Sequence, residues 1–161
     1  MTHLLNDDLA AVRARLQLHS GMGPDHRCAV AGFDGTASSA AALAYARGWA
    51  ERNHGAVVVV HVDATVGATL ADCACAMAGV VVPGLPPRDM SADIDEAMAD
   101  TAAGWAYINV RGDVADQLER IARALEADLI VVGKSARPRM RITHSVGRRL
   151  LATTHHIIVI V

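Results

Sequence analysis

The sequence predicts an α/β domain in which a parallel sheet of five strands carries helices on both faces. Short β-branched runs alternate along the chain with helical segments of about a dozen residues. The runs are apolar almost throughout, as expected for strands that are covered on both faces. With 161 residues, 52% hydrophobic and only 3% aromatic side chains, the chain can build one core from Ala, Val, Leu and Ile.

We divide the chain into a helical N-terminal extension, residues 1–27, and a domain over residues 28–161. Four apolar residues of the extension recur at helical spacing and predict one amphipathic helix. They are Leu5, Leu9, Val12 and Leu16. We expect this helix to pack on the domain or to be mobile, and a role in binding a partner is the alternative.

The first half of the domain predicts a strand, a helix and a second strand. The first strand covers residues 28–33 and leads into a turn, where Thr36 or Ser38 caps the helix. We expect the helix to end at Gly55, because glycine is the usual residue at a helix C-terminus. The second strand follows over residues 56–62.

The middle of the chain is less regular. Ala, Gly and Pro dominate residues 63–89, and we expect a mobile loop or lid there. A helix is predicted over residues 91–103, with Ser91 as its N-cap. Its pattern places Ile94 and Met98 on the inward face.

The remaining elements repeat the alternation of strand and helix. A third strand is predicted over residues 105–110, Asp113 caps the next helix, and a fourth strand covers residues 128–133. A helix over residues 145–152 and a strand over residues 157–161 complete the domain. The helix after Asp113 has one apolar stripe, formed by Val114, Leu118, Ile121 and Leu125. Such strand–helix–strand units form right-handed crossovers.

Composition excludes several classes of function. A formal net charge of −2 and few aromatic residues argue against a nucleic-acid binder. No apolar run reaches the roughly 18 residues of a transmembrane helix. The acidic pair Asp7-Asp8 replaces the apolar core of a signal peptide, so we expect a cytoplasmic protein. Cys28 lies in an apolar run, and Cys73 and Cys75 read as incidental thiols, with metal binding or redox sensing as the alternative.

The strongest functional signal lies after the fourth predicted strand. Gly133 ends that strand, and the segment from Lys134 to Arg149 carries six basic residues and no acidic one. The segment then leads into a predicted helix. A glycine and a basic loop at the carboxyl end of a buried strand favour a phosphate or another anion as ligand.

Several segments of the domain, taken in order, resemble the universal stress protein family of the adenine-nucleotide α-hydrolase-like superfamily. They are residues 29–36, 58–62, 110–113, 127–133 and 145–146, followed by the closing apolar strand. The resemblance implies a sheet with strand order 3-2-1-4-5. It also implies a homodimer that pairs through the last strand, Ile157 to Val161. Many family members bind ATP, and others bind none.

The resemblance also implies roles for single residues. In nucleotide-binding members the first strand ends in an aspartate near the adenosine, and Asp34 takes that place. Backbone at the end of the second strand contacts adenine, which points to Val62 and its neighbours.

The family's phosphate motif is only partly kept. The motif consists of a glycine, two residues, a second glycine, nine residues, and a third glycine followed by serine or threonine. Gly133 matches the first glycine, but Ala136 and His144 replace the other two, and the loop is two residues shorter. Ser145, followed by Val146, supplies the hydroxyl. Glycines let backbone N–H groups approach phosphate, so these replacements crowd the loop.

Basic side chains offset this loss. Lys134, Arg137, Arg139 and Arg141 can hold phosphate by charge-assisted hydrogen bonds, whereas Pro138 removes one backbone donor. Two interpretations stay open: a nucleotide site with altered geometry, and a solvated basic loop with no ligand.

Three hypotheses for function follow. The first is a stress-response module that binds ATP or another adenine nucleotide, with Mg²⁺, in a degenerate site. The second is a dimeric interaction protein that acts on an unknown partner without nucleotide. The third is a slow ATP hydrolase, ranked last because the sequence offers no general base. We assign no catalytic residue and no metal site of the protein itself.

Overall fold

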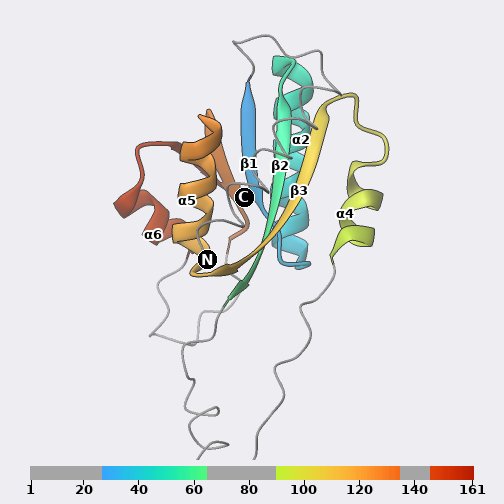
Figure 1. The fold of residues 1–161 in the computed structure, drawn as a ribbon. Coiled ribbons are helices and arrows are strands. Elements are labelled where there is room, and N and C mark those ends of the chain that lie inside the picture. Colours follow the sequence, from blue (N-terminus) through green and yellow to red (C-terminus); the bar gives the residue numbers. More distant parts are fainter. Residues whose placement is uncertain (1–26, 65–89, 135–145) are drawn as a thin grey trace, which may run out of the picture.

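The computed structural model describes residues 27–64, 90–134 and 146–161 (Figure 1). In this part of the chain, five parallel strands form one sheet of order β3-β2-β1-β4-β5, which confirms the predicted α/β fold. The elements are β1 (Cys28–Gly32), α2 (Ala37–Asn53), β2 (Ala56–Ala64), α4 (Ser91–Met98), β3 (Gly104–Gly112), α5 (Val114–Leu125), β4 (Leu129–Val132), α6 (Val146–Thr153) and β5 (Ile157–Ile160).

The helices cover both faces of the sheet (Figure 1). One core lies between the sheet and α2 and α4, where Leu43, Ile94 and Met98 are almost fully buried. The other lies on the α5 and α6 face and includes Leu118 and Leu150. Successive strand residues contribute to opposite cores, as the period of two requires. Burial on both faces explains why the strands read as continuous apolar runs.

Helix α2 begins as predicted but ends differently. Thr36 is its N-cap and accepts a hydrogen bond from the Ser39 N–H. The left-handed residue at the C-terminus is His54, with φ 53°, and not Gly55. Gly55 is instead required by the approach of two chain segments, since a Cβ there would lie 2.6 Å from the Arg27 carbonyl oxygen. The prediction that Gly55 ends the helix was therefore wrong in its reason, because His54 adopts the left-handed conformation and Gly55 serves packing.

Helix α4 is shorter than predicted, and its N-cap prediction was wrong. It covers Ser91–Met98, its N-cap residue is Met90, and no side chain caps it. Met90 is fully buried beside Ile94 and Met98, so packing rather than a capping hydroxyl fixes the start of the helix. The helix closes with a tighter i→i−3 bond from the Ala99 N–H to the Glu96 carbonyl, and β3 begins at Gly104.

In the second half of the domain, the structure agrees closely with the prediction from sequence. Asp113 caps α5 by accepting from the Asp116 N–H, and the predicted apolar stripe packs on the core. Arg149 of α6 donates to Asp113 Oδ2 at 2.6 Å and to Asp116 Oδ1 at 3.0 Å, which ties α6 to the start of α5. Strand β5 lies at the sheet edge, where Ile157 is 67% exposed.

Several other predictions can be compared with the structure. Cys28 is buried as expected, and burial, helped by the charge of Asp128, raises the pKa of its thiol to about 12. None of the helices in the described ranges has the length and apolar character needed to cross a bilayer. The predicted N-terminal helix, the lid up to residue 89, Cys73, Cys75 and the basic loop over 135–145 lie outside the described residues.

Candidate functional site

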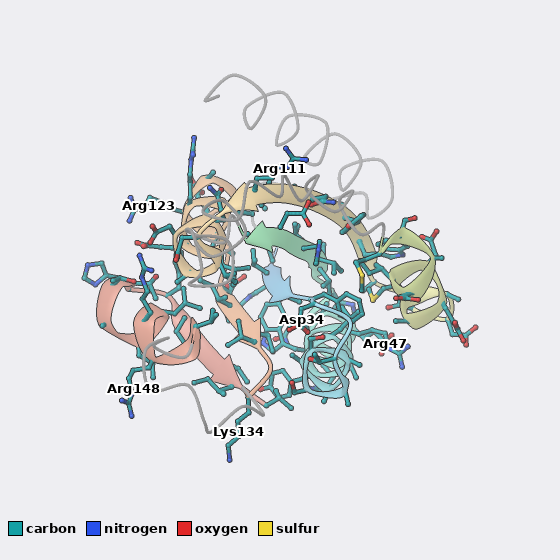
Figure 2. The ribbon with its side chains drawn as sticks, turned by 90° about the horizontal axis from the view of Figure 1, so that it is seen from below. Asp34, Arg47, Arg111, Arg123, Lys134 and Arg148 are labelled. Atoms are coloured by element: carbon teal, nitrogen blue, oxygen red, sulfur yellow. The ribbon has the colours of Figure 1, made fainter. Side chains whose placement is uncertain are left out.

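The predicted site lies at the carboxyl edge of the sheet. The connections through α2 and α4 run over one face of the sheet, and those through α5 and α6 run over the other. The order in which strands are added therefore reverses between β1 and β4. Open α/β sheets bind ligands at such a reversal. Figure 2 looks onto this edge, with Asp34 near its centre beside α2 and Lys134 at its rim.

Asp34 is held at the end of β1 by the turn that follows. Its Oδ1 accepts hydrogen bonds from the Thr36 N–H at 3.0 Å and from the Thr36 hydroxyl at 2.6 Å. Partial burial raises the pKa of Asp34, but the hydroxyls of Thr36 and Ser39 and nearby backbone N–H groups lower it more, so that it lies below its usual value. The side chain remains exposed and ionised at neutral pH. It is therefore a fixed, solvent-accessible acceptor.

Three hydroxyl groups gather beside Asp34 at the start of α2. The Thr36 hydroxyl lies 3.1 Å from the Ser38 hydroxyl and 3.3 Å from that of Ser39. Ser39 is buried and donates to the Thr36 carbonyl at 2.9 Å. Sequence reasoning assigned Thr36 and Ser38 only as alternative caps. Their density in the turn is the signal that could have marked them as part of the site.

Gly133 lies directly against this first turn of α2. A Cβ at Gly133 would lie 2.5 Å from the Ser38 carbonyl carbon and 2.7 Å from the Ser39 nitrogen. No real Cβ makes such contacts with backbone, so glycine is required here by packing whether or not a ligand binds. The retained glycine alone is therefore no proof of phosphate binding.

Lys134 offers a ligand its side chain but no backbone N–H. Its backbone N–H donates to the Val161 carbonyl at 2.7 Å, which extends the pairing of β4 and β5 beyond Val132. The exposed side chain extends outward from the rim (Figure 2). Lys134 can thus contribute charge but not a backbone donor.

Val62, at the end of β2, has no backbone partner on its β1 side within the described residues. In a parallel ladder, alternate residues point their N–H and C=O to the same neighbouring strand. The Phe33 N–H donates to the Val60 carbonyl at 2.9 Å, so Val60 and Val62 both point toward β1. The ladder between β1 and β2 nevertheless stops at Gly32 and Val60. In the described ranges, no backbone hydrogen bond joins Val62 to Phe33 or to the turn that follows it.

A buried histidine occupies the place where the ladder would have continued. His61 is 8% exposed, and its Nδ1 lies 2.9 Å from the Phe33 carbonyl oxygen. Because a carbonyl only accepts, Nδ1 carries the proton. On the other side of the ring, Nε2 lies 3.4 Å from Asp63 Oδ1. In the sequence analysis, His61 is one of the neighbours of Val62 that the family resemblance assigns to the adenine contact.

The structure thus groups some predicted site residues and leaves others undescribed. Asp34 and Gly133 meet at the first turn of α2, since the Asp34 N–H donates to the Ser39 hydroxyl at 3.3 Å. Val62 borders the same turn through its place opposite β1. Val146 opens α6 and packs partly against the core, which leaves mainly its backbone for a ligand. Ala136, Arg137, His144 and Ser145 lie outside the described residues.

The chain matches a family model and several solved structures. A family model described as the universal stress protein family matches residues 27–161. No curated protein sequence matches the chain. Among solved structures, a universal stress family protein from Burkholderia pseudomallei is 27% identical, with a TM-score of 0.59, and the match covers 87% of this chain and 98% of that one.

Two further solved structures are complexes with a nucleotide. A universal stress protein in complex with cAMP is 20% identical, with a TM-score of 0.60, and the match covers 84% of this chain and 96% of that one. The universal stress protein from Archaeoglobus fulgidus in complex with dAMP is 17% identical, with a TM-score of 0.56 and the same two coverages. At these identities the likeness concerns the fold.

Proposed function

The chain belongs to the universal stress protein family, and from this premise we propose that it binds an adenine nucleotide at the carboxyl edge of β1, β2 and β4. The observation that carries the proposal is that, among the described residues, the Val62 N–H and C=O have no partner in β1 or in the turn that holds the ionised Asp34. An unpaired donor and acceptor on one residue match the edge of adenine, where a ring nitrogen accepts and the amino group donates.

The neighbouring groups fit the rest of a nucleotide. Asp34 would accept hydrogen bonds from the ribose hydroxyls, since its carboxylate is ionised and exposed. The phosphates would then lie toward the first turn of α2 and the rim that carries Lys134, where a helix N-terminus and a cation both favour negative charge. Ala136, Arg137, His144, Ser145 and Val146 belong to the same proposal, with Mg²⁺ accompanying the phosphates.

The bound nucleotides of two structural neighbours support this choice of ligand. One neighbour is a complex with cAMP and the other with dAMP, and both share the fold of this chain. Adenine is common to the two ligands, whereas the sugar and the phosphate arrangement differ. This agrees with a site in which the base contacts are the most constant.

Calorimetric titration of the full chain tests the proposal. We expect ATP to bind more tightly than GTP, because guanine carries a carbonyl where adenine carries its amino group. The Asp34→Asn variant should bind ATP about tenfold more weakly, the order expected for one hydrogen bond to a charged group. The matched variant Asp95→Asn, on the exposed side of α4, should bind as the unchanged protein does.

Absence of binding at millimolar ATP, AMP and cAMP, with and without Mg²⁺, would refute the nucleotide proposal. It would leave the dimeric interaction protein as the better account. That account draws on one observation, namely that packing against α2 explains Gly133 without any ligand.

We further propose that the protein forms a homodimer through β5. The strand is an edge of the sheet in the described part of the chain, and Ile157 and Ile160 are 67% and 46% exposed. An exposed apolar edge strand favours pairing with a second strand. The Ile157→Lys variant should therefore elute as a monomer in size-exclusion chromatography with light scattering.

A matched variant locates the interface. Leu151 on α6 is similarly exposed, at 63%, so Leu151→Lys changes charge and apolar area by a comparable amount. This variant should remain dimeric. A dimeric Ile157→Lys protein would place any interface away from β5.

A further inference from the structure

We infer that His61 is a positioning residue that ends the pairing of β1 and β2 one step early and thereby leaves the Val62 N–H without a partner in β1, available to the base of a ligand. The inference rests on the proposed nucleotide function for its ligand part. Its structural part concerns only the backbone of β1 and β2.

The argument starts from the hydrogen bonds that a parallel ladder would otherwise make. After the Phe33 N–H has donated to the Val60 carbonyl, the next bond would join the Val62 N–H to the Phe33 carbonyl. That bond is missing, and the pairing stops at Gly32. A buried carbonyl needs a donor, because leaving it unpaired is unfavourable.

His61 supplies this donor. Its Nδ1–H lies 2.9 Å from the Phe33 oxygen, in a buried position where water cannot readily replace it. The side chain therefore satisfies the carbonyl that Val62 would have satisfied. The consequence is that the Val62 N–H keeps its hydrogen-bonding capacity, although it lies in the middle strand of the β3-β2-β1 part of the sheet.

Asp63 lies beside the ring that makes this bond. Its Oδ1 lies 3.4 Å from His61 Nε2, on the side of the ring away from Phe33. The Asp63 side chain is itself mostly covered, with 24% exposure. The carbonyl and the carboxylate are both acceptors, and the ring lies between them with one nitrogen toward each.

Substitutions that keep or remove the donor test the inference. In His61→Asn the side-chain nitrogen takes the place of Nδ1, whereas in His61→Gln it takes the place of Nε2. His61→Leu removes both donors at comparable volume. If the leucine variant does not fold, the glutamine variant still removes the donor to Phe33.

The first measurement needs no nucleotide. We expect the Val62 amide to exchange its hydrogen about tenfold more slowly in His61→Leu and His61→Gln, because the Phe33 carbonyl then accepts from it. His61→Asn should keep the faster exchange of the unchanged protein. Equal exchange rates at Val62 in all four proteins would overturn the inference.

The second measurement concerns base selectivity. We expect His61→Leu and His61→Gln to lose about tenfold in affinity for ATP while their binding of inorganic triphosphate is unchanged, and His61→Asn to restore ATP binding. A merely structural effect would weaken both ligands alike, which would overturn the positioning role. If the unchanged protein bound no adenine nucleotide, the proposed function would fail, and the exchange rates would still decide what His61 does to Val62.

Discussion

The two halves of the candidate site are built by different means. At the ends of β1 and β2, the sheet presents the backbone of Val62 and the ionised carboxylate of Asp34. Asp34 accepts from the Thr36 N–H and hydroxyl, and His61, next to Val62, is bonded to the Phe33 carbonyl. At the end of β4, the backbone is already in use. Gly133 packs against α2, and the Lys134 N–H pairs with Val161.

This difference indicates which part of a nucleotide the site should recognise specifically. Groups held by a sheet keep their positions before a ligand arrives, so little conformational entropy is lost on binding. A long exposed lysine must be ordered and competes with water, so it contributes less and is screened by salt. We therefore expect base recognition to be specific and phosphate binding to be weak and non-specific.

The largest expected effect tests whether Gly133 serves packing. Gly133→Ala should lower the free energy of unfolding by about 3 kcal/mol, because its Cβ would overlap the backbone of Ser38 and Ser39. Urea denaturation of the protein without ligand measures this change. Gly48→Ala is the matched control, since a Cβ there would meet only the flexible end of Arg52, at 3.1 Å, and alanine favours the helix by up to about 1 kcal/mol.

A stable Gly133→Ala protein with impaired ATP binding would reverse this interpretation. The glycine would then serve the ligand, and the β4 half of the site would resemble the β1–β2 half. If both variants were equally stable and bound ATP equally well, the contact between β4 and α2 would be looser than the structure describes.

The fold could be predicted because its signals are local and repeated. Apolar runs gave all five strands, and Asp113 and Thr36 gave two helix starts that the structure confirms. The errors fall where tertiary packing decides. His54 takes the left-handed position expected of a glycine, and the buried Met90 begins α4 in place of a capping serine.

The site could be predicted only in part, for the same reason. The position of Asp34 after a strand is visible in the sequence, and so is the glycine at 133. The cause of that glycine is not visible, because Ser38 is 95 positions away in the chain and meets it only after folding. The role of His61 likewise depends on a carbonyl in another strand, 28 positions away.

An intermediate effect tests the difference in salt sensitivity between the two halves. Raising the salt concentration from about 0.05 M to about 0.5 M should weaken ATP binding about fivefold, because exposed cations hold its phosphates. Adenosine, which uses only the β1–β2 half, should bind with nearly constant affinity. Titration calorimetry at several salt concentrations measures both ligands.

The variant Lys134→Gln sharpens this test. It should reduce the salt dependence of ATP binding and leave adenosine binding unchanged, since only the charge at the rim is lost. Equal salt dependence for the two ligands would show that the halves do not divide the nucleotide in the way proposed.

The smallest expected effect concerns the pH dependence that Asp34 gives to stability. The pKa of Asp34 is lowered in the folded protein because, although burial raises it, hydrogen bonds to the carboxylate lower it more. Unfolding therefore raises this pKa, and protons bind the unfolded state more readily. The stabilisation is fully present above the ordinary pKa of aspartate and is lost as the pH falls through the lower folded value.

Comparison with Asp34→Asn isolates this contribution from all other carboxylates. The variant keeps an oxygen that accepts from Thr36 but cannot ionise, so it should be less stable at pH 7 by at most about 1 kcal/mol, given the exposure of the group. Urea denaturation at successive pH values should show the difference closing below about pH 4. A difference that stayed constant with pH would mean that the turn holds Asp34 by geometry alone, and the rigid, charged acceptor that distinguishes the β1–β2 half from the β4 half would lose its electrostatic basis.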